Sequence, residues 1–475
     1  MGMFSKSIFG PGWIRESASA TSEAPPALAS SASEIAMSGN DDDLDSAAAG
    51  LQPKCIASTG DAFNGRTIRK LERHYQPMLS DHDDTNFFLD AQWSADGTSI
   101  VTLNNDESLR AFVLPPELLD PAQQPHNLIS HSTLSSATRI QSYTLYPRFN
   151  LNDSSTTLIL SSASDLPLRL TNALHSGYVH ATYSHIHPTT EAFIASNSLT
   201  FIGNGSHFAS GSQGSVSVFD ASRDGEGPVI THRTKPKNPA DAATSMRDSG
   251  KILALSESCD GFLAAGSSNR IVGIFSKSGH GPCETAFSVA SSSDEELQRA
   301  GSGITSLAWT PNGQYLLVAE RQSDGVHVYD VRYQLRRLAW LSGRRADTTQ
   351  RLGIDIVPTA DGCEVWAGGT DGFVRMWRNP GSMEGEQKPD AELKLHNDAV
   401  PSAVWHPGGA VLATCSGQQH FAEDDESSGS ESDGGSNSDE SSSDSEDEDV
   451  RLASARSAIW NTHREIDNTL RVWAI

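Results

Sequence analysis

The chain has 475 residues and a formal net charge of −25, with 37% hydrophobic and 7% aromatic residues. No apolar run reaches the ~18 residues of a membrane-spanning helix, so we expect no membrane association. The 5 cysteines lie far apart and form no Cys-x-x-Cys pair, which argues against a disulfide framework or a zinc site and favours a reducing compartment. Residues 1–15 lack the continuous apolar stretch of a secretory signal, so we expect no secretion.

The first part of the chain, residues 1–70, has the composition of a disordered tail. Up to about Gly60 it is rich in Ser, Ala, Pro and Asp. Such a segment cannot bury enough apolar surface to offset the entropy lost on ordering. We therefore expect the folded domain to occupy residues 80–475.

A short phrase recurs from about Asn86 onward. A β-type run is followed by a turn with Asp, Asn or Gly, then by a strand of small residues, a second turn, and a strand that ends on an apolar or aromatic residue. The seven strand-ending residues are Phe112, Leu170, Phe219, Phe275, Tyr329, Trp377 and Trp473. Most intervals are about 50 residues, slightly longer than a tight WD40 repeat.

The repeat predicts an all-β fold, a seven-bladed WD40 β-propeller. Turns such as Asp96-Gly97 and Asn312-Gly313 supply residues that tolerate a positive φ, as tight hairpins require. One four-stranded sheet cannot bury both faces, whereas seven stacked around an axis can. The alternatives are a β-sandwich or two β domains. Because the chain stops at a strand end, we expect both ends of the domain to meet in one blade and close the ring.

An acidic segment interrupts the last repeat. The stretch from Glu423 to Asp449 carries about half of the net charge of −25 and contains no Lys or Arg. We interpret residues 421–456 as a disordered insertion, whose charge does not exclude an anionic ligand elsewhere. It is either an inert solubilising loop or a segment that attracts basic partners and masks a basic face. Its candidate phosphorylation sites, which precede acidic residues, are Ser441, Ser442, Ser443 and Ser445.

Several phrases outside the generic repeat resemble the telomerase Cajal body protein family of WD40 proteins. The exit from the first blade, LPPEL, begins at Leu114, and the phrase SSASDLPLRLTNA begins at Ser161. The loop GRRADTTQRLGIDI runs from Gly343 to Ile356. The phrase HPGGAVLATCSGQQHF begins at His406 and is followed, as in that family, by an acidic insertion. The resemblance covers most of the chain from about Phe87.

The resemblance implies a non-catalytic protein that binds small nuclear or Cajal body RNA, including telomerase RNA, together with its ribonucleoprotein proteins. A related yeast propeller acts around pre-mRNA splicing. We expect a nuclear location, with the cytoplasm as an alternative, and a monomer. A scaffold that binds only proteins is the competing hypothesis, and basic proteins are candidate partners of the acidic segment.

Two basic connections between blades are the candidate RNA-binding elements. Connections between successive blades open on one face of a propeller, so cations far apart in sequence share a surface there. Arg and Lys can contact phosphates, and Gln350 with Arg351 could read the base edges of an unpaired strand. The candidates are Arg233, Lys235, Lys237, Arg344, Arg345, Gln350 and Arg351. The simpler alternative is that these are solvated loop charges.

Other candidate sites are weaker. His185 and His187 stand two residues apart, but a third metal ligand at a helpful spacing is missing, so we expect no metal. Phrases typical of a nucleophile elbow or a phosphate-binding loop are also missing, so we expect neither catalysis nor a cofactor. Arg110, Arg375 and Arg471 occupy equivalent strand positions and are interpreted as repeat features.

Overall fold

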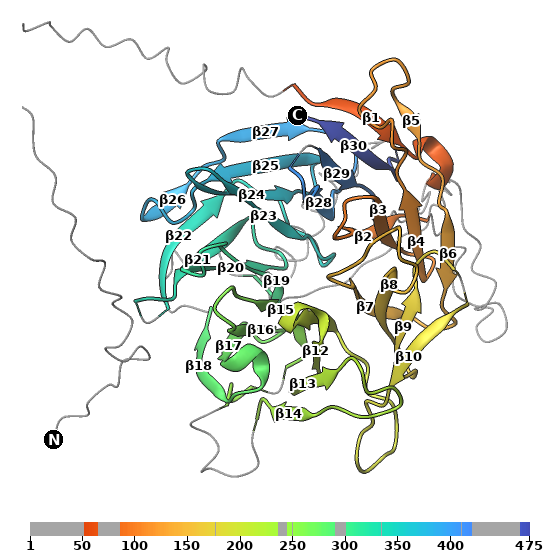
Figure 1. The fold of residues 1–475 in the computed structure, drawn as a ribbon. Coiled ribbons are helices and arrows are strands. Elements are labelled where there is room, and N and C mark those ends of the chain that lie inside the picture. Colours follow the sequence, from red (N-terminus) through yellow and green to blue (C-terminus); the bar gives the residue numbers. More distant parts are fainter. Residues whose placement is uncertain are drawn as a thin grey trace, which may run out of the picture. The chain divides into compact units, whose positions relative to one another are not determined.

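The computed structural model describes residues 52–64, 86–175, 177–235, 245–248, 250–289, 301–333, 335–409, 411–419 and 466–475. The chain divides into two compact units, residues 1–50 and 51–475, and the described residues all lie in the second. This unit is a ring of seven sheets, here called blades 1 to 7 (Figure 1). Within the described residues there is no helix long and apolar enough to cross a membrane.

The first four blades follow the chain around the ring (Figure 1), and residues of the first strand of each line its centre. Blade 1 contains β2 (Phe88–Trp93), β3 (Ser99–Asn104), β4 (Ser108–Val113) and β6 (Ser132–Ser135). Blade 2 contains β7 (Ile140–Leu145), β8 (Leu158–Ala163), β9 (Leu168–Asn172) and β10 (Val179–Tyr183). Blade 3 contains β11 (Ser198–Ile202), β12 (His207–Ser212), β13 (Ser215–Asp220) and β14 (Ile230–Arg233). Blade 4 contains β15 (Ile252–Glu257), β16 (Leu263–Ser267), β17 (Ile271–Phe275) and β18 (Cys283–Ser288).

The other three blades include two five-stranded sheets. Blade 5 contains β19 (Ile304–Trp309), β20 (Tyr315–Glu320), β21 (Gly325–Asp330), β22 (Arg336–Ser342) and β26 (Gly385–Gln387). Blade 6 contains β23 (Ile354–Thr359), β24 (Gly362–Gly368), β25 (Phe373–Arg378) and β27 (Ala391–Lys394). Blade 7 contains β28 (Ser402–Trp405), β29 (Leu412–Cys415), β30 (Leu470–Ala474), β1 (Lys54–Ser58) and β5 (His126–Asn127). Short 3-10 helices are η1 (Gly60–Phe63), η3 (Gly203–Gly205) and η5 (Lys277–Gly279).

The predicted seven-bladed propeller is confirmed, and its core explains why the sandwich alternative is wrong. The buried apolar residues form seven clusters, each made of side chains from two adjacent blades. Alternate residues of one strand face opposite neighbours: Leu316 packs toward blade 4 and Leu317 toward blade 6. Every sheet therefore buries both faces, which a ring allows and a single sheet does not.

The strand-ending residues of the repeat all lie on the third strand of a blade, from Phe112 on β4 to Trp473 on β30. The arginines interpreted as repeat features are also explained. Arg110, Arg375 and Arg471 lie on the third strands of blades 1, 6 and 7, and each forms an ion pair with the aspartate four residues earlier. That aspartate lies in the connection between the second and third strands. The ion pair therefore fixes this connection to the third strand.

The hairpin glycines behave as their sequence context predicts. Gly97 has φ +71° between β2 and β3, and Gly313 has φ +68° between β19 and β20. At Gly97 an added Cβ would lie 2.1 Å from Nε2 of His406, so both the conformation and the space require glycine.

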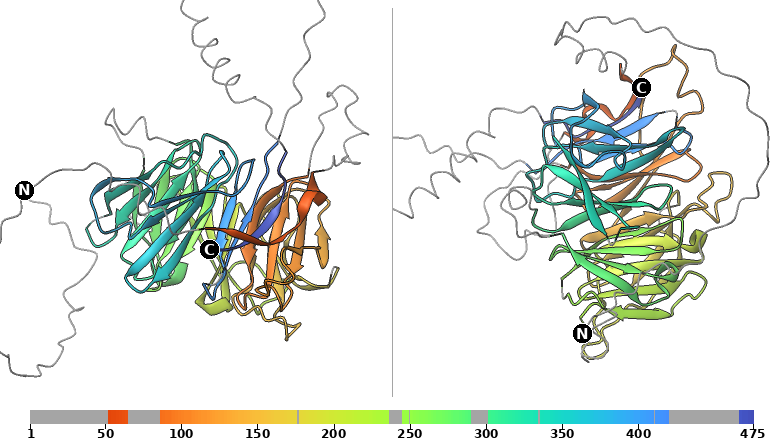
Figure 2. Two further views of the ribbon diagram at one scale, coloured as in Figure 1. Left: turned by 90° about the horizontal axis from the view of Figure 1, so that it is seen from above. Right: turned by 90° about the vertical axis from the view of Figure 1, so that its left-hand side faces the viewer.

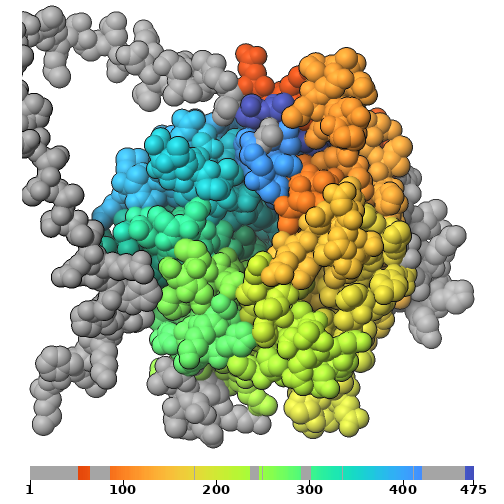
Figure 3. Space-filling view, viewed as in Figure 1, coloured from red at the N-terminus to blue at the C-terminus, as the bar shows by residue number. Residues whose placement is uncertain are grey.

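Blade 7 closes the ring, as expected, but the closing strand comes from an unexpected place. Strand β1 pairs antiparallel with β30, and Lys54 lies opposite Ala474. The two ends lie side by side in the space-filling view, where β1 is red and β30 dark blue (Figure 3), and the further views agree (Figure 2). The prediction that residues 1–70 are disordered is therefore wrong for Lys54–Phe63, because the free edge of β30 supplies hydrogen bonds that the composition of this segment does not reveal.

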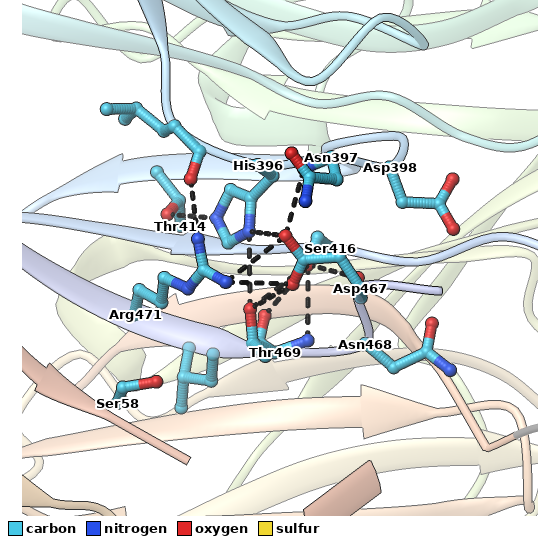
Figure 4. A network of polar contacts seen from close by, with 12 residues as sticks. Ser58, His396, Asn397, Asp398, Thr414, Ser416, Asp467, Asn468, Thr469 and Arg471 are labelled. Atoms are coloured by element: carbon cyan, nitrogen blue, oxygen red, sulfur yellow. Dashed lines mark hydrogen bonds and ion pairs between the residues drawn. The ribbon is translucent and has the colours of Figure 1, made fainter. Parts of the chain in front are cut away.

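A buried polar network holds the two halves of blade 7 together on either side of the acidic insertion (Figure 4). His396 contacts Thr414 Oγ1 through Nε2 at 2.7 Å, and the indole of Trp473 donates to the same oxygen at 2.8 Å. The other ring nitrogen of His396 lies 3.5 Å from the Asp467 carboxylate. Burial alone would raise the pKa of Asp467, but hydrogen bonds from His396, Thr469 and the Asn397 amide outweigh it and hold that pKa well below its usual range.

Candidate functional site

One end of the ring, here called the loop face, carries the connections between successive blades and the turns between second and third strands. Both basic connections named from the sequence lie here, one after β14 and the other between β22 and β23. The ring therefore brings loops that are more than 100 residues apart in sequence to one end of the molecule, as expected for a propeller.

The centre of the ring contains a cavity of about 610 Å³. Its walls come from the first strand of every blade, so no single blade forms it. Among the described residues, four cations line it, Arg139, Lys251, Arg321 and Arg351, but only one carboxylate, Asp90. A concave surface with this balance is unusual in a chain of net charge −25, and it concentrates positive potential at one place.

The cations of the cavity come from four different blades, and three of them occupy equivalent positions before a first strand. Arg139 directly precedes β7, Lys251 directly precedes β15, and Arg351 lies three residues before β23. Arg321 directly follows β20, in the turn between the second and third strands of blade 5. All four positions are at the loop-face ends of their strands, so together they surround the mouth of the cavity.

Arg351 reaches across the mouth from blade 6 toward blade 3. Its Nη2 donates to the backbone carbonyl of Asn197 at 2.9 Å. Burial lowers the pKa of Arg351 to about 10, and the nearby charges of Arg321 and Arg139 act in the same direction, while Asp90 opposes them. The predicted candidate thus lies inside the cavity, with one hydrogen bond to the protein and other donors left.

Arg321 and Arg139 complete the cationic mouth. Burial lowers the pKa of Arg321, and the charge of Arg139 adds to this effect. The Nε atom of Arg321 is buried and has no hydrogen-bond partner among the described residues. Among the described residues, neither Arg139 nor Arg321 forms an ion pair with a carboxylate. Three guanidinium groups therefore repel one another across a small space, with few compensating contacts.

Asp90 lies deeper in the cavity. Ser402 Oγ donates to one carboxylate oxygen at 2.6 Å, and Gln92 Nε2 to the other at 3.2 Å. Burial raises the pKa of Asp90 despite these hydrogen bonds, which weakens it as a counter-charge for the arginines. The mouth therefore keeps a positive balance.

Gln350 holds the same loop against blade 7. Its Nε2 donates to the carbonyl of Gly417 at 3.1 Å, and its backbone amide donates to Thr348 Oγ1 at 3.1 Å. Gly417 directly precedes the last described residues before the acidic insertion. The loop beside the cavity thus touches the base of that insertion, which itself lies outside the described residues, as do all four candidate phosphoserines.

The prediction that Arg344 contacts RNA is not supported by its position. Its side chain is 1% exposed and donates to the backbone carbonyls of Gly368 at 3.1 Å and Leu352 at 2.7 Å. Burial lowers its pKa to about 10, with the charge of Asp324 opposing. Arg344 thus fixes the course of the loop from inside, and it cannot reach a ligand on the surface.

The remaining predicted residues that the structure describes, Arg345, Arg233 and Lys235, are exposed. The side chain of Arg345 is 64% exposed, and its Nε lies 3.7 Å from Asp371, which also binds Arg375. Such a surface ion pair is weak and leaves the guanidinium accessible. Arg233 and Lys235 are exposed at the end of β14, and Lys237 lies outside the described residues. The structure does not bring Arg233 or Lys235 into the cavity.

Sequence reasoning missed Arg139, Lys251 and Arg321. None belongs to a basic run, and each stands alone among uncharged or acidic residues. The only available signal was their shared position beside a strand end on the loop face, which requires the blades to be aligned with one another.

The two histidines of the candidate pair lie in different environments. His185 is buried, and burial lowers its pKa to about 4, whereas His187 is exposed. The Nδ1 atom of His187 accepts hydrogen bonds from the amides of Thr189 and Thr190 at 3.3 Å, so this residue shapes a turn. Within the described ranges, no group of three or more His, Cys, Asp or Glu residues could hold a metal ion.

Comparisons with known proteins agree with the architecture. The WD domain, G-beta repeat model matches residues 295–330. The guanine nucleotide-binding protein negative regulator 1 of Schizosaccharomyces pombe is 32% identical over 302 residues, which are 63% of this chain and 72% of that protein. Telomerase Cajal body protein 1 of Mesocricetus auratus is 27% identical over 379 residues, 78% of this chain and 65% of that protein.

A further relative is protein SWT21 of Kluyveromyces lactis, 28% identical over 260 residues, which cover 52% of this chain and 58% of that protein. The chain thus spans less than two thirds of the length of this relative and of the Cajal body protein. The resemblance inferred from the sequence phrases is confirmed by these matches.

Proposed function

Because the chain belongs to the family of WD40 propellers that includes telomerase Cajal body protein 1, we propose that its loop face binds a small nuclear or Cajal body RNA and that the two form a ribonucleoprotein. The function is binding, without catalysis. Telomerase RNA is one candidate ligand, because one relative carries telomerase in its name. Nuclear action, in RNA localisation or pre-mRNA splicing, belongs to the same proposal.

The observation that carries this proposal is the concentration of cations on the loop face. Arg139, Arg321 and Arg351 surround the cavity mouth, and Arg345 is exposed on the loop that carries Arg351. Neutralisation of phosphates by Arg and Lys supplies most of the affinity of sequence-independent RNA binding. RNA specificity mostly resides in unpaired segments, which a rim of loops can surround.

The first experiment is a census of RNA crosslinked to the full-length protein in cells. We expect enrichment of a small number of nuclear RNAs over a control propeller. Enrichment no better than that of the control would refute the proposal. Nuclear fluorescence of the tagged full-length protein tests its location in the same cells.

The second experiment measures RNA affinity at several salt concentrations. Arg345→Glu should weaken binding and lower the salt slope by about 0.7 for each single-stranded phosphate that is no longer neutralised. Arg378→Glu is the matched control, because Arg378 is exposed at the opposite end of the ring, where it pairs with Glu364 at 3.3 Å. Equal weakening in both variants would mean that only the net charge matters.

A protein-only scaffold is the second candidate. The name of the Schizosaccharomyces pombe relative describes a negative regulator of a guanine nucleotide-binding protein, which favours a protein partner. Purification of the tagged chain with and without ribonuclease separates the two functions. Partners that survive ribonuclease and the Arg345→Glu substitution would favour the scaffold. The same purification tests basic partners of the acidic segment and the monomeric state.

A further inference from the structure

We infer that the mouth of the central cavity is a binding site for a phosphate monoester, such as the terminal phosphate of a single-stranded RNA, held by Arg139, Arg321 and Arg351. This inference deepens the proposed function and rests on it only for the choice of RNA as the carrier. The site is distinct from the exposed cations of the rim, because its residues line a cavity walled by all seven blades.

The charge balance selects the chemistry of the ligand. Four cations and one buried carboxylate line the cavity. By themselves the arginines repel one another, and Nε of Arg321 has no partner among the described residues. A monoester carries close to two negative charges at neutral pH, whereas each backbone phosphate of RNA carries one. Three guanidinium groups are therefore compensated better by the doubly charged monoester than by a singly charged backbone phosphate. The planar guanidinium group can also donate two parallel hydrogen bonds to phosphate oxygens.

The size of the cavity is suited to the end of a chain. About 610 Å³ lies within the usual range for small-ligand sites, which is roughly 300–1,000 Å³. A terminal nucleotide can enter such a space through the mouth with only one RNA segment behind it. An internal nucleotide could enter only if the RNA segments on both sides of it passed through the same mouth. The walls also include the polar side chains of Gln92 and Ser142, whose donors bind Asp90 and the carbonyl of Ser196.

The alternative explanation is that the arginines only hold the loops. For Arg351 this is part of the account, because it binds the carbonyl of Asn197. It does not explain Arg321, whose buried Nε has no partner within the described ranges, or Arg139, which is exposed and approaches two like charges. Arg321 is therefore the informative position for a test.

The test compares four probes on the full-length protein at physiological salt: a ten-nucleotide single-stranded RNA with a 5′-phosphate, the same RNA with a 3′-phosphate, the same RNA with hydroxyl groups at both ends, and a free nucleoside monophosphate. Binding is followed by fluorescence anisotropy or calorimetry. We expect at least one phosphorylated end to bind about tenfold more tightly than the unphosphorylated RNA. Arg321→Gln should abolish the difference, and Arg378→Gln should preserve it.

The variants also report on folding. Because Arg321→Gln removes repulsion from a half-buried site, its Tm should equal or exceed that of the wild type. If it fails to fold, Arg139→Gln at the exposed member of the set replaces it. Equal affinity of all three RNAs, or a preference that persists in Arg321→Gln, would overturn the inference while leaving RNA binding intact. Arg321-dependent binding of the nucleoside monophosphate without any RNA binding would support the site and refute the proposed function.

Discussion

The role of β1 as the closing strand can be tested with one substitution, Ile56→Ala. Ile56 is fully buried on the outer side of β30, in the apolar cluster between blades 7 and 1, together with Phe88, Phe112 and Val472. Alanine keeps the backbone free to pair with β30 and removes three carbons from the cluster. Truncation of a buried isoleucine to alanine costs about 2–5 kcal/mol, depending on how far the surroundings relax into the cavity that it leaves. Here the surrounding residues belong to two blades, whose paired strands limit such relaxation. We expect a loss of about 3 kcal/mol in the free energy of unfolding.

The assay is thermal and urea unfolding of the full-length protein, followed by tryptophan fluorescence. For a domain of this size a loss of 1 kcal/mol lowers Tm by about 2 °C, so the expected decrease is about 6 °C. Lys54→Ala on the same strand is the control, because Lys54 is exposed and opposes Ala474 only through the backbone. It should change Tm by less than about 1 °C.

A wild-type Tm and urea midpoint for Ile56→Ala would refute the reasoning. That result would mean that β1 contributes no buried surface to blade 7 and that the ring closes with β30 alone. A similar loss in both variants would point instead to a general effect of changing this segment.

Three further substitutions probe a turn, a loop and the polar network. Gly97→Ala should lower the free energy of unfolding in urea by at least about 2 kcal/mol, because φ of Gly97 is +71° and the new Cβ would clash with His406. An unfolding midpoint equal to that of the wild type would contradict this. Arg344→Met should lower the free energy of unfolding by about 3 kcal/mol, because it leaves buried carbonyls without donors. The RNA affinity per folded molecule should be unchanged. Weaker RNA affinity at wild-type Tm would mean that Arg344 does contact RNA. Burial lowers the pKa of His396, so its contribution to stability is complete above the unfolded pKa of about 6.5 and is lost as the pH falls below that value. Tm should therefore decrease from about pH 7.5 to about pH 5.5, and less steeply in His396→Asn; parallel curves would argue against the network.

The propeller could be predicted from the sequence because its determinants are local. Each blade needs short strands, turns that tolerate a positive φ, and apolar residues on both faces, and all of these recur along the chain. The aspartate and arginine four residues apart are equally local, because turn and strand are neighbours in sequence. The family phrases around Gln350 and Gly417 also proved to be in contact, since the side chain of one binds the carbonyl of the other.

The candidate site depended on contacts that no local pattern contains. Arg344 and Arg345 are adjacent and have the same chemistry, yet one is 1% exposed and the other has a side chain 64% exposed, because the path of the loop turns the first inward. Strand β1 is five residues in a region of unpromising composition, and only the open edge of β30 makes it a strand.

The cationic mouth is the clearest case of this difference. Arg139, Arg321 and Arg351 come from three connections separated by up to 212 residues, the difference between positions 139 and 351. Periodicity and turn chemistry specify each blade, since they act over a few residues. Only closure of the ring specifies which side chains meet at its centre, because that placement requires all seven blades at once.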